Sequence, residues 1–402
     1  MKFKLRDFLT NIYAFGFFNS LIFLYPVYAI FFADNGLSDI QISVLFIIWS
    51  LATMAFQVPV NIFASIFKPK QMVIFCQFMK LSAFVLWFMW PTFYGFALGF
   101  ILWGIQWANW DSVTEGMIYD ELKELRSKKA YVKISGRRSF VDMIAILIGA
   151  SGSLLLAFGY GIIFALSIIS LLVSIFFLWR TKLTKNIPHN IGVGLAKRLS
   201  VGTRVLRASP YVLKMFILAC VLNAVYVIDD YMGLIGIELG MPVIYIGAIF
   251  FMTQAAQNLG SVFAYKFEHI KNSALYYGSI GLGLILALFY FTFNLPAILL
   301  LGLFFLVCGA LYTIAFGRMQ HAISSGCRTM VLGMNSVLTQ VVCIFVYVLV
   351  GIGLAFGGFN YSMLLVGALC AAVGIWALLF LKKYSVKANS ADDCINYKQI
   401  KK

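Results

Sequence analysis

Twelve long apolar segments, separated by mostly short gaps, dominate the 402-residue chain. A hydrocarbon core about 30 Å thick needs roughly 20 helical residues to cross it, and the segments meet that length. Lys and Arg concentrate in the termini and in every second gap, whereas the intervening gaps contain neither. Because positively charged loops stay on the cytoplasmic side of a membrane, this alternation predicts a polytopic membrane protein with both termini in the cytoplasm.

The predicted spans are 8–32, 40–67, 71–90, 93–118, 136–158, 161–179, 211–236, 243–265, 272–293, 295–317, 329–356 and 360–381. We expect an all-α fold of two six-helix bundles, 1–180 and 211–383, joined by a cytoplasmic linker, 181–210, and followed by a polar tail, 384–402. The connection 180–210 has seven basic residues and no acidic one. It is either a helix lying on the inner leaflet or a solvated linker.

Composition agrees with a membrane protein: the chain is 62% hydrophobic and 11% charged, with a mean hydropathy of +0.92. Its net charge of +16 lies along one membrane face in this topology. We therefore interpret the charge as orientation and attraction to anionic lipid headgroups, and not as nucleic-acid binding. The seven cysteines form no CxxC pair, so we expect neither a disulfide framework nor a metal site. The expected location is the inner or plasma membrane.

A faint internal repeat relates the two halves. A shift of about 204 residues places Asn19 over Asn223 and Gly36 over Gly240. Each half begins with a span, a short outer turn that contains Gly and an acid, and a charge-free second span. The sequence therefore predicts two bundles of similar topology.

Ionisable residues inside the spans are the candidates for function, because a charge near the bilayer centre costs roughly 2.5 to 3.5 kcal/mol and usually faces the bundle interior or water. Span 7 contains the adjacent acids Asp229 and Asp230, with Asn223 and Tyr226 deeper in the same span. A carboxyl group removed from water binds a proton more readily. We favour Asp229 as a substrate or proton-coupling group; Asp230 is the acid that we expect to reach the outer headgroup region.

Lys80 lies about halfway along span 3, farther from its inner end than a lysine comfortably snorkels. It is a candidate for an anionic substrate or for pairing with an acid in the membrane. Asn19 in span 1 and Trp107 in span 4 are further substrate candidates. For Asn19, a hydrogen bond between helices is at least as good an explanation, and Lys80 is interfacial if the limits of span 3 shift. For the aromatic run Trp103, Trp107 and Trp110, we favour packing and interface anchoring over a stacking site.

A cluster of acids and arginines is predicted where the cytoplasmic ends of spans 4 and 5 meet. Asp111 and Glu115 are four residues apart and share a helical face, and Arg137, Arg138 and Asp142 begin the next span. Such a network either latches a cytoplasmic gate or permanently anchors the two helices.

The segment from Asp111 through Glu115, Tyr119, Asp120, Leu122 and Lys123 to Gly136 and Arg137 resembles the exit of span 4 in a branch of major facilitator superfamily transporters. ISSGCRTMVLGMNSVL, with Arg328 and Ser336, is similar to that branch's entrance to span 11. The usual superfamily loop between spans 2 and 3 is missing: FASIFKPKQ lacks its acid and its arginine pair. Span 5 also lacks the Gly-Pro pair that is typical of many drug-proton antiporters.

The resemblance implies alternating access in two six-helix bundles, with spans 1, 4, 5, 7, 8 and 11 around a central cavity. No GxxxxGK[ST] phosphate loop is present, which agrees with secondary transport. We expect a monomeric carrier for a small organic solute, driven by a proton gradient and without a cofactor. Export of amphiphilic compounds and uptake of a polar metabolite or siderophore both stay open. The alternatives of another class are a membrane-embedded transferase and a channel.

Overall fold

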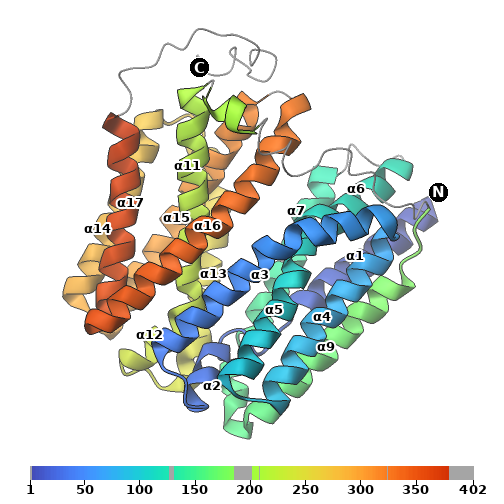
Figure 1. The fold of residues 1–402 in the computed structure, drawn as a ribbon, viewed down its shortest axis with the longest axis horizontal. Helices are drawn as coiled ribbons and strands as arrows, with labels where there is room; N and C mark the ends of the chain where they lie inside the picture. Colours follow the sequence, from blue (N-terminus) through green and yellow to red (C-terminus); the bar gives the residue numbers. More distant parts are fainter. Residues whose placement is uncertain (1, 126–130, 185–201, 208, 324, 380–402) are drawn as a thin grey trace. The chain divides into compact units, whose positions relative to one another are not determined.

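The structure, a computed structural model, describes residues 2–125, 131–184, 202–207, 209–323 and 325–379. In this part the chain is almost entirely helical (Figure 1). Nine helices or runs of helices among these residues are long and apolar enough to cross a membrane. Each predicted span coincides with a helix or a run of helices. The predicted all-α membrane fold is confirmed.

The chain divides into two compact units. One holds Met1–Gly192 with Met232–Ile237 and Met241–Phe251, and the other holds Val193–Tyr231, Glu238–Gly240 and Met252–Lys402. The bundle limits expected from the sequence stay a prediction. Most of the basic linker, and the tail 384–402, lie outside the described residues.

The first unit is built on the helices of the first half. α4 and α1 both pack along α9, and α5 packs along α3 and α4 (Figure 1). The elements are α1 (Lys2–Ser20), α2 (Tyr28–Asp34), α3 (Asp39–Ile66), α4 (Pro69–Met89), α5 (Phe93–Asn109), the π-helical turn η1 (Trp110–Thr114), α6 (Glu115–Glu124), α7 (Tyr131–Gly149), α8 (Gly152–Leu155), the 3₁₀ turn η3 (Leu156–Phe158) and α9 (Tyr160–Arg180).

The second unit is built on the helices of the second half. α14 packs most extensively along α17, and α11 packs along α15 and α16. The elements from residue 210 onward are α11 (Pro210–Ala224), the 3₁₀ segment η4 (Val225–Tyr231), α12 (Met232–Glu238), η5 (Val243–Tyr245), α13 (Ile246–Phe263), η6 (Ala264–Phe267), α14 (Asn272–Thr292), η7 (Leu295–Ala297), α15 (Ile298–Ala322), α16 (Ser325–Gly357) and α17 (Phe359–Leu379).

Local sequence signals fix several helix starts. At the start of α3, the Ser38 hydroxyl accepts from the Gln41 backbone N–H and the Gln41 side chain accepts from the Ser38 N–H, which forms a capping box. α4 and α11 each begin with proline, a residue that suits the first helical turn because it has no N–H to leave unpaired. These signals explain why the predicted starts of these spans lie within two residues of the observed ones.

The first span of each half is broken, and the breaks follow the sequence repeat. α1 stops at Ser20 and α2 begins at Tyr28, so 21–27 lies between two helices. A shift of about 204 residues carries this gap onto η4, carries α2 onto α12, and carries Gly36 (φ 88°) onto Gly240 (φ 79°). The repeat that the sequence only suggested is thus present in the backbone. Spans 1 and 7 were each expected to be a single α-helix. Each instead consists of two α-helices, separated by residues 21–27 in span 1 and by the 3₁₀ segment η4 in span 7.

A small residue lets α3 and α5 approach closely. A Cβ placed on Gly104 of α5 would meet the Ala52 Cβ at 2.8 Å and the Thr53 backbone nitrogen at 3.0 Å, both on α3. Side-chain packing, and not a hydrophobic drive from water, holds helices together in lipid, so small residues are needed at such crossings.

We predict that Gly104→Ala destabilises the protein by about 1 to 3 kcal/mol, because the added methyl group forces α3 and α5 apart. Gly281→Ala in α14 is the matched control, since a Cβ at that position meets nothing within 4 Å. The measurement is the free energy of unfolding in a detergent titration. Equal stabilities of the two variants would contradict the prediction.

Candidate functional site

The break in span 1 is held by hydroxyl groups from α9. The Ser170 hydroxyl donates to the Phe18 carbonyl at 2.8 Å, and the Ser174 hydroxyl donates to the Phe15 carbonyl at 3.0 Å. Ser167 accepts from the Leu24 N–H at 3.2 Å. The three serines are three and four residues apart and share one buried face of α9. Because free backbone groups cannot find water in a bilayer, this serine face makes the interruption possible.

Lys80 of α4 reaches the same break. Its ammonium group donates to the backbone carbonyl of Asn19 at 3.0 Å and to the Asn19 side-chain oxygen at 3.2 Å, and it lies 5.6 Å from the ring centre of Tyr25. Lys80 is 2% exposed. The structure thus brings together two of the predicted candidates, Lys80 and Asn19, at the end of α1.

An aromatic wall continues from Tyr25, which belongs to the break. Tyr25 stacks on Trp103 at 5.7 Å, Trp103 lies 5.6 Å from Trp49, and Trp49 lies 5.8 Å from Trp107. We call these four residues the aromatic wall. Trp107 is 42% exposed, whereas Trp103 is buried. The predicted candidate Trp107 is therefore linked to Lys80 through three other rings and not directly.

The indole N–H groups of Trp49 and Trp103 are buried and have no hydrogen-bond partner among the described residues. Buried polar groups are normally paired, and an indole nitrogen is a donor only. Two donors of the aromatic wall therefore lack an acceptor from the described part of the chain.

Asp229 lies in η4, the 3₁₀ segment in the middle of span 7. One carboxylate oxygen accepts from the Thr253 hydroxyl at 2.6 Å, and the other accepts from the Gln254 side-chain amide at 2.7 Å. Both donors are neutral and belong to α13. Among the described residues no ion pair involves Asp229.

The neighbouring Asp230 faces other partners. It accepts a hydrogen bond from the Tyr347 hydroxyl of α16 at 2.6 Å, and Tyr347 is fully buried. Asp230 is thus held by a hydrogen bond within the protein, and its expected position at the outer headgroup region stays a prediction. Tyr226 stacks on Phe305 at 6.1 Å, and Asn223 is half-buried near the end of α11.

Arg138 is the centre of the predicted charge network. It forms an ion pair with Glu115, its Nε lies 3.8 Å from Asp142, and its guanidinium lies 6.0 Å from the Trp110 ring centre. Arg137 is exposed. The Asp111 side chain lies outside the described set. The structure therefore brings together three of the five expected members: Glu115, Arg138 and Asp142.

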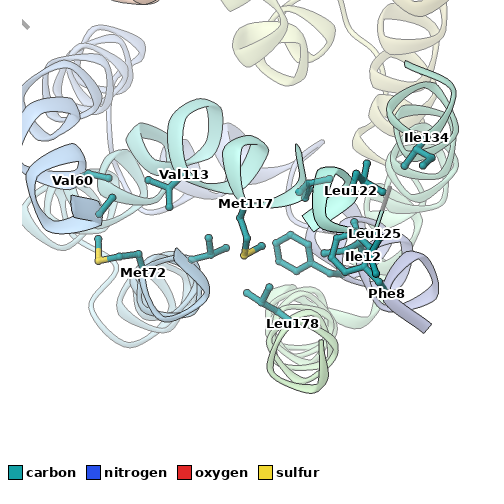
Figure 2. Close-up of a cluster of buried hydrophobic side chains, with 14 of the residues drawn as sticks. Phe8, Ile12, Val60, Met72, Val113, Met117, Leu122, Leu125, Ile134 and Leu178 are labelled. Atoms are coloured by element: carbon teal, nitrogen blue, oxygen red, sulfur yellow. The ribbon is translucent and has the colours of Figure 1, made fainter. Parts of the chain in front are cut away.

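A hydrophobic cluster fixes the helix that carries Glu115. Figure 2 shows Met117 and Leu122 of α6 among Phe8 and Ile12 of α1 and Leu178 of α9. A π-helical turn, η1, joins α5 to α6 directly before Glu115, and such turns occur frequently at functional sites. The cluster therefore positions one end of the charge network.

Residues 8–328 match the family model of the Major Facilitator Superfamily. The chain belongs to the Major Facilitator Superfamily. No curated protein sequence matches it.

Solved structures of superfamily transporters share this fold. The nucleoside transporter NupG has a TM-score of 0.72 at 14% identity, over 96% of this chain and 100% of that chain. A D-xylose-proton symporter has a TM-score of 0.71 at 13% identity, over 96% and 99%. A bacterial homolog to the human lysosomal transporter Spinster, in an inward-facing and unoccupied conformation, has a TM-score of 0.67 at 15% identity, over 96% and 99%. At these identities the likeness shows the fold alone.

Membership in the Major Facilitator Superfamily makes this chain an integral membrane protein that transports a small molecule and is not an enzyme. The membrane-embedded transferase that the sequence left open is thereby excluded. Secondary transport, which the resemblance implied, is supported by the same comparisons.

Sequence reasoning missed several residues of these sites. Tyr347 and Thr253 lie in apolar spans and carry no charge, so no local signal distinguishes them. The buried serines of α9 did carry a signal, because hydroxyl residues at helical spacing on one face of an apolar span indicate interhelical hydrogen bonds. Trp103, for which we expect packing or interface anchoring, packs against Tyr25 and Trp49 in the aromatic wall.

We predict that Arg138→Met lowers the free energy of unfolding by about 2 kcal/mol, because it leaves the carboxylates of Glu115 and Asp142 without their cation. This value lies between the roughly 1 kcal/mol of a surface ion pair and the roughly 3 to 5 kcal/mol lost when a buried pair is broken. Arg137→Met, at the exposed neighbour, is the control. Stability is measured by detergent titration. A loss no larger than that of Arg137→Met would contradict the prediction.

The triple variant Glu115→Gln, Arg138→Met, Asp142→Asn separates gating from anchoring, because it removes the charges together and leaves none stranded. We expect it to regain most of the stability that Arg138→Met loses. If transport then returns as well, the network only anchors the helices. If the triple variant is stable but inactive, the network acts in the gate.

Proposed function

We propose that this chain is a proton-coupled secondary carrier for a small organic solute, working by alternating access, and that Asp229 is its coupling group. One observation carries the assignment. Asp229 is a carboxyl group in the broken part of a membrane span, and within the described ranges its two oxygens accept from the neutral donors Thr253 and Gln254 and from no cation. Interrupted segments at corresponding places in the two halves mark the binding region in secondary transporters.

The electrostatics of Asp229 support proton coupling. An ionised carboxylate without a cationic partner is costly in a low-dielectric bundle. Binding a proton removes that charge, and releasing it restores the charge. The protonation state of Asp229 therefore changes the energy of the surrounding helices, which is what a driving ion must do.

The acids around Arg138 differ from Asp229 because they have a cationic partner. The Arg138 guanidinium lies beside Glu115 and Asp142, so both acids of the charge network already have a cation. Proton transfer at that network would break existing ion pairs. For this reason we assign coupling to Asp229 and a structural or gating role to the network.

The membrane orientation belongs to the same proposal. The alternation of basic gaps supports an orientation with both termini in the cytoplasm and the carrier in the inner or plasma membrane. Export of amphiphilic compounds and uptake of a polar metabolite or siderophore differ in the solute and in its direction relative to the proton, which is antiport in export and symport in uptake. Assays in vesicles of both orientations decide between them.

The solute is first identified by a thermal-stability screen of the purified protein against nucleosides, sugars, peptides, amphiphilic compounds and organic acids. We then predict that Asp229→Asn loses accumulation driven by an imposed pH gradient, by more than tenfold, and keeps exchange of labelled for unlabelled solute. The amide preserves size but cannot carry the proton. Proteoliposome uptake and counterflow measure the two activities.

Asp230→Asn is the matched control, because it makes the same change one residue away at a carboxylate held by Tyr347. We expect it to keep most of the gradient-driven accumulation. Coupling that persists in Asp229→Asn and fails in Asp230→Asn would overturn the assignment. A channel would show no counterflow in either protein.

A further inference from the structure

Lys80 is a buried cation without a carboxylate partner. It is 2% exposed, and among the described residues its hydrogen-bond acceptors are both oxygens of Asn19. No described acid forms an ion pair with it. A buried charge normally carries a partner of opposite sign, since an unpaired one costs several kcal/mol.

The end of α1 compensates part of this charge. The Asn19 carbonyl belongs to the last turn of α1, where the helix dipole is negative. A helix end contributes about 0.3 to 2 kcal/mol to a nearby charge, less than full pairing supplies. An ammonium group also has three donor hydrogens, and Asn19 accepts two of them.

The aromatic wall supplies a second, independent observation. Two of its members, Trp49 and Trp103, have buried indole N–H groups without an acceptor in the described part of the chain. The wall begins at Tyr25, over which the Lys80 ammonium lies, and ends at the partly exposed Trp107. Two donors without an acceptor and a cation without a carboxylate partner thus occur along one series of contacting rings among the described residues.

We infer that this region of the first unit binds an organic anion whose carboxylate group is held by Lys80 and whose aromatic body packs on the wall. The carboxylate takes the third ammonium hydrogen, and the indole N–H groups donate to the polar atoms of the same solute. Charge-assisted hydrogen bonds of this kind are about twice as strong as neutral ones. The inference rests on the proposed transport function, because it names the class of its solute.

The charge of Lys80 and the rings of the aromatic wall together favour an aromatic carboxylate over other classes of solute. A neutral sugar or nucleoside leaves the Lys80 charge uncompensated, and an organic cation repels it. A small inorganic anion satisfies Lys80 but adds no aromatic surface to pack on the aromatic wall. An aromatic carboxylate satisfies both parts, since large aromatic surfaces contribute through packing and stacking.

The test is equilibrium binding to the purified full chain in nanodiscs of zwitterionic lipid, so that no anionic headgroup competes. The probes are benzoate, 1-naphthoate and indole-3-acetate, each paired with its neutral carboxamide, measured by isothermal titration calorimetry. We expect at least one carboxylate to bind about tenfold or more tightly than its amide, since a hydrogen bond to a charged group contributes about 1.5 to 3 kcal/mol.

Two variants test the residues. Lys80→Met reduces the preference for carboxylate over amide to about one, whereas Lys80→Arg keeps part of it. Trp103→Phe removes only the indole donor and ring area, and we expect it to weaken binding several-fold without abolishing the preference. If Lys80→Met does not fold, Lys80→Arg, Trp103→Phe and Trp49→Phe carry the test.

Three results would overturn the inference: no carboxylate binds more tightly than its amide, Lys80→Met keeps the preference, or neither tryptophan variant lowers affinity. Either of the first two would leave Lys80 as a cap of α1 only, and the third would remove the aromatic wall from the site. Gly281→Ala, which lies outside both proposed sites and where a Cβ meets nothing within 4 Å, is the control and keeps carboxylate binding. Binding without gradient-driven uptake would refute the coupling proposal alone, and uptake of a neutral solute would refute the anion site alone.

Discussion

Hydrogen-bond satisfaction of an interrupted helix in lipid is the constraint on which the first unit depends. The last four carbonyl groups of a helix have no partner within it, and in a bilayer water does not supply one. In α1 the carbonyl of Phe17 accepts from the Leu21 N–H, and that of Ser20 accepts from the Ile22 N–H. The other two accept from side chains of neighbouring helices: Phe18 from Ser170, and Asn19 from Lys80. Every orphan carbonyl is thus accounted for, and two of the four depend on tertiary packing.

The corresponding break in the second half is satisfied differently. α11 passes into a 3₁₀ segment, η4, so the backbone continues to make hydrogen bonds of its own. The Val225 N–H donates to the carbonyls of Val221 and Asn223, and the Cys308 thiol lies 3.3 Å from the Leu222 carbonyl. No cation is used at this break among the described residues. The two halves share the position of the interruption but carry opposite charges there: a lysine in the first and two aspartates in the second.

Much of the fold was predictable because its cause is local. The apolar runs and the starting prolines set the starts of α4 and α11 to within two residues. The breaks were not predicted, for two reasons. In span 1 the one visible signal is Pro26, and a proline in a membrane helix is compatible with a mere kink. In span 7 the segment VYVIDDY contains no Pro or Gly, so its 3₁₀ form reflects packing rather than propensity.

The residues of the candidate sites were also predictable only in part. Lys80 and Asp229 were found because ionisable residues stand out in an apolar span. Their partners were not, because Thr253, Tyr347 and Trp103 have ordinary roles in such spans and acquire these contacts only when distant helices pack. The choice between Arg137 and Arg138 depends on the rotation of α7, which two adjacent arginines in the sequence do not specify.

The hydrogen bonds of Asp229 suggest how a proton at this position would act on α13. An ionised carboxylate accepts from both Thr253 and Gln254, as observed. A protonated carboxyl group has one oxygen that donates, so it needs an acceptor that the ionised group does not need. Either the Thr253 hydroxyl accepts and directs its own hydrogen elsewhere, or the Gln254 amide turns over and offers its oxygen. Under the proposed coupling, protonation therefore changes the link between η4 and α13 at one of these two bonds, in a 3₁₀ segment whose backbone geometry differs from that of the α-helices beside it.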